Sequence, residues 1–378
     1  MRLKGGHYLP LSALACGLLT TAVPAAGPVA AGNAHATSDY QWQLPSGFPA
    51  PPVPRNNAMS RAKVELGRRL FRDQRLSVSG QYACISCHLP ERAYTDGRSK
   101  ALGALGGSTA RSAMTLTNVA YNAAFTWGNS RTRTLEEQMR VPLFNEHPIE
   151  LGLKGREIQV TQSLSADESY RRDFAQAFPA DARPVCMTNV IKAVAAYERT
   201  LISGRSPFDR YVYGDDPQAL SASAKRGMAL FYSKRVGCAQ CHFGINFDGP
   251  IRSQDRPVES ALFANNGSFD EQRSRSHGVV DRGLFEVTRR KADIGKFRVP
   301  TLRNIGLTAP YMHDGRLTTL SEVIDHYASA GRQTGDFRPR RHDIVDRRIR
   351  PFKMSSTEKD DLIAFLDSLT DREFVSLR

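Results

Sequence analysis

Two short segments of the sequence share the pattern Cys-x-x-Cys-His, at residues 84–88 and 238–242. Two thiols at this spacing can bond the two vinyl groups of one porphyrin, and the adjacent histidine is then placed to bind its iron. A zinc site would need two further ligands at each segment, and a redox-active dithiol has no need of the histidine. We therefore expect two covalently bound molecules of heme c. Their attachment points and iron ligands are predicted at Cys84, Cys87, His88, Cys238, Cys241 and His242.

The first motif is followed by no further histidine until His147. The first heme is therefore expected to keep one open face, where a peroxide can bind. Cleavage of the O–O bond needs a group that moves protons, and a carboxylate suits that task. The segment 142–150 offers Glu146, His147 and Glu150, and spacing alone does not choose among them.

The elements that must position these motifs repeat along the chain. Upstream of each motif a glycine precedes a phenylalanine by four residues, as Gly67 and Phe71 and again as Gly227 and Phe231. Such a duplication at helical spacing predicts two related domains. The expected boundaries are 37–58 for a proline-rich extended arm on the surface, 59–212 for an N-terminal peroxide-binding heme domain and 213–378 for a C-terminal electron-transfer heme domain.

The expected fold class is mainly α, with two cytochrome c-like heme domains, long loops and few strands. Apolar residues at helical spacing predict helices over 189–202, 320–327 and 357–369, the first ending at Gly204 and the third beginning at Thr357. Clean two-residue alternation is scarce, so strands should be minor. Two segments are expected to be loops, the glycine-rich one at 103–107 and the basic one at 338–350.

The length, composition and net charge limit the class of protein and the kinds of partner. The 378 residues include 52 Lys and Arg against 38 Asp and Glu, a formal charge of +14. This length suits about two domains, and the recurring aromatics, prolines and glycines exclude a disordered chain or a coiled coil. A basic excess fits nucleic acid, an acidic protein or an anionic surface alike.

The first residues have the features of an export signal. Arg2 and Lys4 precede an apolar stretch over 9–26, and residues 34–36 read Ala-His-Ala, a small-x-small cleavage site. We expect a signal peptide over 1–36, cleaved after Ala36, and a periplasmic protein with no stable membrane insertion. Losing Arg2 and Lys4 lowers the charge from +14 to +12. Export argues against nucleic acid as a partner, and Cys186 is then an inert thiol.

The segments between and after the motifs resemble the bacterial diheme cytochrome c peroxidase and MauG superfamily. Within it, the block 142–150 and the segment 203–211 are most similar to the MbnH group, the MauG-like proteins associated with methanobactin operons. The matching segments are Leu135-Glu136-Glu137-Gln138, His147-Pro148-Ile149-Glu150-Leu151-Gly152, Pro300-Thr301-Leu302-Arg303-Asn304 and Leu307-Thr308-Ala309-Pro310-Tyr311-Met312-His313-Asp314-Gly315.

The resemblance implies roles for four residues around the first heme. Glu150 corresponds to the distal glutamate that assists peroxide cleavage, and Gln138 and Pro142 correspond to residues that line the same pocket. Trp127 corresponds to the tryptophan that lies between the two hemes and couples them. The spacing from Trp127 to Gln138 is one residue longer than in the peroxidases, so the local loop differs.

For the second heme, the resemblance implies that Tyr327 is the iron ligand opposite His242. Met312 is the alternative, since a thioether is a common heme ligand. The resemblance also implies a calcium ion between the hemes. Its implied ligands are Ser112, Thr308 and Pro310, although family members usually have Asn where Ser112 stands.

The resemblance implies an enzyme that uses H2O2 to form a high-valent bis-Fe(IV) state and then oxidises a residue of a partner protein. In the MbnH group this residue is a tryptophan of MbnP, which becomes kynurenine so that MbnP can bind copper. Two alternatives stay open: a diheme cytochrome c peroxidase that takes electrons from a small redox protein, and a diheme electron carrier without enzymatic activity. Val236 stands where MauG has the tryptophan of its exit path, and Tyr232 is a candidate for that path by proximity in sequence only.

Overall fold

The computed structural model describes residues 40–258, 260–269, 280–331 and 345–376. The signal peptide predicted over 1–36 and the first part of the loop predicted over 338–350 lie outside the described residues. No helix of the described ranges is long and apolar enough to cross a membrane.

The described residues are mainly helical, and the two short strands β1 (Phe263–Ala264) and β2 (Phe297–Arg298) pair antiparallel. The expectation of a mainly α fold with few strands is confirmed. The α-helices are α1 (Arg61–Leu70), α2 (Leu135–Phe144), α3 (Glu157–Ala166), α4 (Glu168–Ala177), α5 (Met187–Glu198), α6 (Pro207–Tyr213), α7 (Ala222–Tyr232), α9 (Phe285–Thr288), α10 (Leu320–Ala328), α11 (Ser356–Asp367) and α12 (Arg372–Ser376). The 3-10 helices are η1 (Arg55–Asn57), η2 (Gln74–Leu76), η3 (Cys84–Ser86), η4 (Pro90–Arg92), η5 (Val119–Tyr121), η6 (Cys238–Gln240), η7 (Lys291–Asp293) and η8 (Ile305–Leu307).

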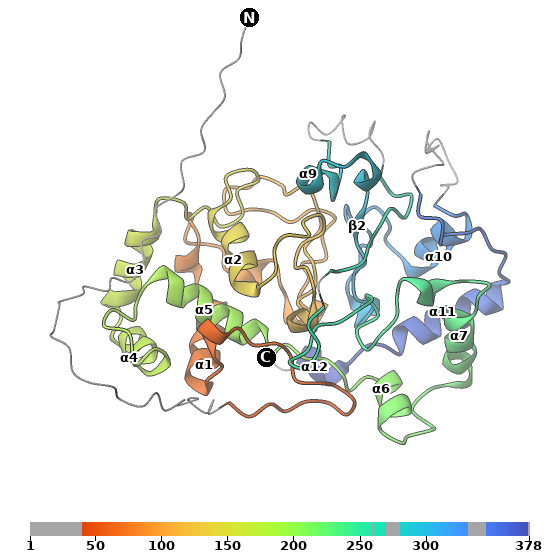
Figure 1. Cartoon of the computed structure of the whole chain (residues 1–378), viewed down its shortest axis with the longest axis horizontal. Helices are drawn as coiled ribbons and strands as arrows, with labels where there is room; N and C mark the ends of the chain where they lie inside the picture. Colours follow the sequence, from red (N-terminus) through yellow and green to blue (C-terminus); the bar gives the residue numbers. More distant parts are fainter. Residues whose placement is uncertain (1–39, 259, 270–279, 332–344, 377–378) are drawn as a thin grey trace, which may run out of the picture.

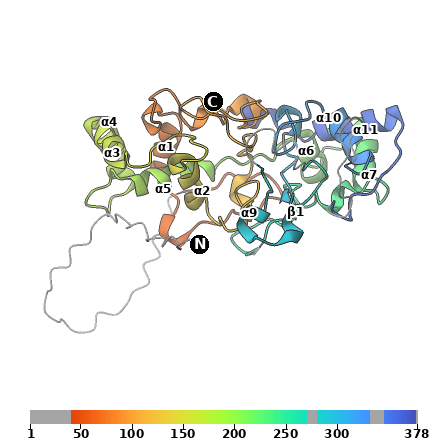
Figure 2. The same cartoon turned by 90° about the horizontal axis from the view of Figure 1, so that it is seen from above.

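Two hydrophobic cores organise the chain. The first takes its buried residues from Met59 to Leu201, and the second takes its own from Phe208 to Leu369. Helices α1 to α5 lie on one side of the molecule and α6, α7, α10 and α11 on the other, in both views (Figures 1 and 2). The chain then returns, because Phe374 of α12 packs into the first core. The last helix therefore ties the two halves together.

Each core is built on one close helix crossing. A Cβ atom added at Gly67 of α1 would lie 1.9 Å from the carbonyl oxygen of Ala193 in α5. A Cβ atom added at Gly227 of α7 would lie 1.9 Å from the carbonyl oxygen of Asp361 in α11. Only glycine lets two helix backbones approach this closely. The repeated glycines of the sequence are therefore the crossing points of two equivalent helix pairs.

The phenylalanine four residues after each glycine packs against an aromatic side chain of the opposite helix. The ring centroids of Phe71 and Tyr197 are 5.3 Å apart, and those of Phe231 and Phe365 are 5.1 Å apart. Phe71, Phe231 and Phe365 are fully buried, and Tyr197 is nearly so. Aromatic pairs at this separation stabilise a core beyond their buried area. The duplication seen in the sequence is thus also a duplication of packing.

All three predicted helices differ from expectation at one or both ends. Helix α5 begins two residues earlier than predicted and ends at Glu198, with Arg199 as its C-cap. Gly204 does not cap it, because the backbone N–H of Gly204 donates to the Asp371 carboxylate at 3.0 Å. The N-cap of α11 is Ser355 rather than Thr357, and its hydroxyl accepts from the backbone N–H of Glu358. The predicted helix over 320–327 corresponds to α10, one residue longer.

The described part of the proline-rich arm, residues 40–58, touches both halves. The hydroxyl of Tyr121, in the first half, donates to the Pro49 carbonyl at 2.8 Å. The guanidinium of Arg303, in the second half, lies 4.9 Å from the centroid of the Phe48 ring. Phe48 itself is buried. The arm therefore adds a further tie between the two cores.

Candidate heme sites

The two Cys-x-x-Cys-His segments fold alike. Each begins with a 3-10 turn, η3 in the first and η6 in the second. The backbone N–H of His88 donates to the Cys84 carbonyl at 3.1 Å, and that of His242 donates to the Cys238 carbonyl at 2.9 Å. One tight turn in each segment thus holds both thiols and the histidine on a short stretch of backbone.

The two histidine rings are held in the same way. Nδ1 of His88 lies 2.8 Å from the Tyr94 carbonyl oxygen, and Nδ1 of His242 lies 2.8 Å from that of Phe247. A carbonyl only accepts, so Nδ1 carries the proton and Nε2 keeps its lone pair for a metal. Burial lowers the pKa of both histidines, which favours the neutral ring. Tyr94 and Phe247 both have positive φ angles, 63° and 53°, which turn their carbonyls toward the rings.

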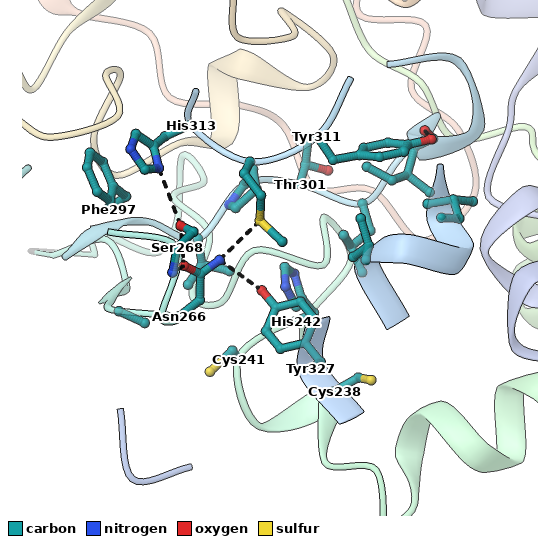
Figure 3. Close-up of a pocket in the computed structure, with 18 of the residues that line it drawn as sticks. Cys238, Cys241, His242, Asn266, Ser268, Phe297, Thr301, Tyr311, His313 and Tyr327 are labelled. Atoms are coloured by element: carbon teal, nitrogen blue, oxygen red, sulfur yellow. Dashed lines mark hydrogen bonds between the residues drawn. The ribbon is translucent and has the colours of Figure 1, made fainter. Parts of the chain in front are cut away.

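A cavity of about 210 Å³ adjoins the second motif. It is lined by Cys238, Cys241 and His242 and by apolar side chains of α7, α10 and α11. Figure 3 shows the motif on one side of this cavity and Tyr327 close to it. A partly open, mostly apolar cavity beside two thiols and a histidine fits a porphyrin.

One buried charge supports this fit. Arg298 lines the cavity, is 4% exposed and pairs with Asp248 at 3.4 Å. Its Nε has no hydrogen-bond partner among the described residues. Buried polar groups are nearly always paired, so an unpaired guanidinium nitrogen here indicates a missing anionic partner. A heme propionate has the required charge.

Both candidate ligands for the second iron line this cavity. Nδ2 of Asn266 lies 3.2 Å from Sδ of Met312 and 3.4 Å from Oη of Tyr327. Burial raises the pKa of Tyr327 to about 12, while the hydrogen bond from Asn266 opposes that rise. His326 turns elsewhere, because its Nε2 lies 2.8 Å from the Asn266 carbonyl oxygen. Tyr327 and Met312 therefore both line the cavity that would hold the second heme, and the choice between them as iron ligand stays a prediction.

Trp127 lies where the two halves meet. It precedes α2 of the first half, yet it lines the cavity of the second motif. Its indole Nε1 donates to the Ser112 carbonyl at 3.0 Å, and the backbone N–H of Ser112 donates to the His313 carbonyl at 2.9 Å. The backbone N–H of Arg298 donates to the Trp127 carbonyl at 2.8 Å. Backbone bonds from both halves thus fix the indole at the wall of the second site.

The structure separates the three proton-transfer candidates of the first site. Glu146 and His147 are exposed, and Glu146 pairs with Lys154 at the surface. Glu150 is half-buried, and burial raises its pKa. Burial, with the carboxylates of Asp96 and Glu150 nearby, raises the pKa of the Cys87 thiol to about 11. Of the three, Glu150 is the one whose carboxylate acts electrostatically on the first motif.

A glycine that the sequence did not single out for this purpose holds the Glu150 segment in place. A Cβ atom added at Gly103 would lie 1.9 Å from the Ile149 carbonyl oxygen. The next residue, Ala104, donates its N–H to the Glu150 carbonyl at 2.6 Å. Gly103 is buried, whereas Gly106 and Gly107 are exposed as expected of a surface loop. The 103–107 loop is therefore packed at one end against the candidate site.

Gln138 and Pro142 lie four residues apart on α2, and thus on one face of that helix. Both are half-buried. Thr134 caps α2 with a capping box that includes Glu137. The Pro142 carbonyl accepts from the N–H of Leu151 at 2.9 Å, which joins the helix to the residue after Glu150. Helix α2 is therefore bonded to the Glu150 segment at Pro142, and Gln138 lies one turn earlier on the same face.

The three implied calcium ligands line the second cavity. The hydroxyl of Ser112 donates to the Met312 carbonyl at 3.2 Å, and that of Thr308 donates to the Ile305 carbonyl at 3.3 Å. In the described ranges, no group of three or more His, Cys, Asp or Glu side chains could hold a metal ion. A calcium ion would thus depend on backbone and hydroxyl oxygens, and it stays a prediction.

Comparisons with known proteins agree with this geometry. Residues 61–217 match the family model described as Di-haem cytochrome c peroxidase. The methylamine utilization protein MauG of Methylorubrum extorquens is 34% identical over 345 residues, 89% of this chain and 88% of that protein. Cytochrome c551 peroxidase of Pseudomonas aeruginosa is 30% identical over 376 residues, 98% of this chain and 94% of that protein.

Among solved structures, a MauG-like protein associated with microbial copper homeostasis superposes with a TM-score of 0.84. Its sequence is 38% identical to this one, and the superposition covers 89% of this chain and 97% of that protein's chain. The chain therefore belongs to the family of diheme cytochrome c peroxidases and MauG proteins. It is a peroxidase-type diheme oxidoreductase, and the resemblance inferred from the sequence is confirmed.

Proposed function

We propose that this protein uses H2O2 to oxidise a tryptophan of a partner protein to kynurenine, the partner being a copper-binding protein resembling MbnP. The observation that carries the proposal is the placement of Trp127, which comes from the first half and lines the cavity of the second. Such a residue can pass electrons between the two sites. The likeness to a MauG-like protein associated with microbial copper homeostasis supports the choice of partner.

The residues fit two heme c groups, one in each of the halves that the two cores define, Met59–Leu201 and Phe208–Leu369. Cys84 and Cys87 would bond one and Cys238 and Cys241 the other, with Nε2 of His88 and His242 toward the iron atoms. The hemes, when bound, supply the iron that reacts with peroxide and holds the two oxidising equivalents taken from it. Tyr327 is proposed as the second ligand of the C-terminal heme, and a calcium ion at Ser112, Thr308 and Pro310 belongs to the same proposal.

Glu150 moves the protons. Its carboxylate would take a proton from one oxygen of the peroxide and return it to the leaving oxygen, so that water departs. A carboxyl group with a raised pKa is better matched to this two-way transfer near neutral pH than an exposed one. Gln138 and Pro142 on α2 shape the approach to it.

The remaining features fit an exported enzyme with a protein substrate. A folded partner cannot reach a half-buried carboxylate, so its oxidation would proceed by electron transfer over a distance. The +12 charge expected after removal of residues 1–36 would draw an acidic partner to the surface. We place the mature protein in the periplasm.

One observation favours a second candidate, a cytochrome c peroxidase that reduces H2O2 with electrons from a small redox protein. Met312 lines the same cavity as Tyr327 and is held by the same amide. A sulfur ligand stabilises reduced iron, as an enzyme that first takes up an electron requires.

The test is to incubate the diheme protein, its copper-binding partner and H2O2, and to analyse the partner by peptide mass spectrometry. We expect kynurenine at one partner tryptophan, absent without H2O2. The matched variants are Trp127→Phe, expected to yield far less product, and Tyr82→Phe, a conservative change on the first core. An unmodified partner tryptophan, combined with rapid peroxide reduction by a small cytochrome, would support the second candidate instead.

A further inference from the structure

Asn266 is a residue of the second cavity to which neither sequence motif nor family likeness assigns a role above. Its side chain points at both candidate iron ligands (Figure 3). Nδ2 lies 3.2 Å from Sδ of Met312 and 3.4 Å from Oη of Tyr327. A carboxamide has two N–H donors, so it can serve both acceptors at once.

The direction of this amide is fixed by Ser268. The backbone N–H of Ser268 donates to Oδ1 of Asn266 at 3.1 Å, and its hydroxyl lies 2.6 Å from the same oxygen. A backbone N–H can only donate, so it must face the amide oxygen rather than the amide nitrogen. The NH2 group is therefore turned toward Met312 and Tyr327, and the assignment does not depend on the usual ambiguity of an asparagine side chain.

The backbone of Asn266 is also anchored to the helix that carries Tyr327. Its carbonyl lies 2.8 Å from Nε2 of His326, the residue before Tyr327 on α10. A Cβ atom added at Gly331 would lie 2.6 Å from the same carbonyl oxygen, so a glycine after α10 is needed for this approach. The amide and the tyrosine are thus parts of one rigid unit.

Met312 stands on a different element. It lies in the loop between η8 and α10 and has a positive φ angle of 73°. Its sulfur is joined to the rigid unit only through Asn266, among the contacts that the structure records for its side chain. Loss of the amide N–H would free the thioether within a cavity that also contains His242.

We propose that Asn266 is a positioning residue that selects Tyr327 over Met312 as the ligand opposite His242. One N–H directs the tyrosine oxygen and the other restrains the methionine sulfur. Groups that hydrogen-bond metal ligands from outside the coordination sphere commonly change affinity or activity by about 10- to 100-fold when removed. The inference rests on the proposed heme attachment but is independent of the proposed substrate.

The test compares Asn266→Ala and Asn266→Asp with the unaltered diheme protein by absorption and electron paramagnetic resonance spectroscopy and by redox titration. Asn266→Asp keeps the size of the side chain and removes the donor. In both variants we expect a population with the signature of methionine-ligated heme. We also expect at least about a tenfold shift toward reduced iron in the second heme, a rise of about 59 mV.

Two further variants separate selection from general damage. Asn266→Ala combined with Met312→Leu should lose the methionine signature. Asn265→Ala removes the neighbouring amide, which bonds the Ile294 carbonyl and the Gly267 N–H instead, and should leave the spectrum of the second heme unchanged. An unchanged spectrum and potential in both Asn266 variants would overturn the proposal. A methionine signature in the unaltered protein would also overturn it, whatever happens to the partner's tryptophan.

Discussion

The two halves of the molecule share their framework and differ in the side chains that lie near the heme motif. Each half has a helix crossing at a glycine, Gly67 or Gly227, and a histidine whose Nδ1 is held at 2.8 Å by a carbonyl. Near the first motif the structure places the half-buried carboxylate Glu150, whereas the cavity of the second motif is lined by Tyr327 and Met312. A duplicated framework can thus hold the same cofactor twice, and in the proposed function the side chains beside each motif decide whether the iron reacts or passes electrons.

The largest effect is expected from removing Glu150, the acid–base group proposed for the first half. Glu150→Gln should slow the reaction with H2O2 by about 10²- to 10⁴-fold, because general acid–base catalysis contributes that much. Stopped-flow absorption measures the rate, and both hemes should still be attached. Glu146→Gln is the matched control, since Glu146 is exposed and pairs with Lys154. Equal rates for the unaltered protein and Glu150→Gln would remove Glu150 from its role.

Because the two helix crossings are equivalent, the same substitution should destabilise both halves by the same amount. Gly67→Ala and Gly227→Ala each place a methyl group 1.9 Å from a carbonyl oxygen. Each should lower the free energy of unfolding by roughly 1–3 kcal/mol, because the helices must move apart. Gly107→Ala, which meets no atom within 4 Å, should change it by less than about 0.5 kcal/mol. Thermal unfolding measures all three, and a neutral Gly227→Ala would show that the crossings are not equivalent.

The second half should respond to one of its two candidate ligands and not to the other. Tyr327→Phe is expected to change the spectrum of one low-spin heme and to raise its potential, because an oxygen ligand that favours oxidised iron is lost. Met312→Leu should change neither. The two variants control for each other, since both side chains contact the Asn266 amide. The reverse result would assign Met312 as the ligand and favour the peroxidase alternative.

A smaller effect is a difference in pH dependence between the two heme sites. Burial raises the pKa of Glu150 above its ordinary value of 4.5, and only its deprotonated form can accept the first proton. The rate of peroxide reaction should therefore rise with pH through this raised pKa and fall as acid protonates the carboxylate. Redox titration of the second heme should not follow the same curve. A rate profile that is identical in Glu150→Gln would assign the pH dependence to another group.

The sequence predicted what depends on local pattern. The heme motifs, the repeated glycines and the helix over 320–327 are all visible within short windows, because their residue types and spacing are dictated by local chemistry. The predicted end of α5 was wrong because Gly204, which could have capped the helix, instead bonds Asp371 and packs against the Phe48 ring. Both partners are distant from Gly204 in the sequence.

The contacts of Asn266 in the wall of the second site were beyond the reach of sequence reasoning for the same physical reason. Asn266 meets Met312 and Tyr327 at sequence separations of 46 and 61 residues. Its own segment, Asn-Asn-Gly-Ser at 265–268, has the composition of an ordinary turn. Spacing alone likewise did not choose among Glu146, His147 and Glu150; the family resemblance pointed to Glu150, and burial also sets it apart from the two exposed residues. Contacts between distant residues carry this information.

The most direct test of the account is to add one equivalent of H2O2 to the diheme protein with both irons oxidised and no reductant present. We predict an immediate change in the absorption of both hemes, a state that lasts long enough to be observed and that decays when the partner protein is added. No reaction until one heme has been reduced would contradict the proposed function and identify a cytochrome c peroxidase instead.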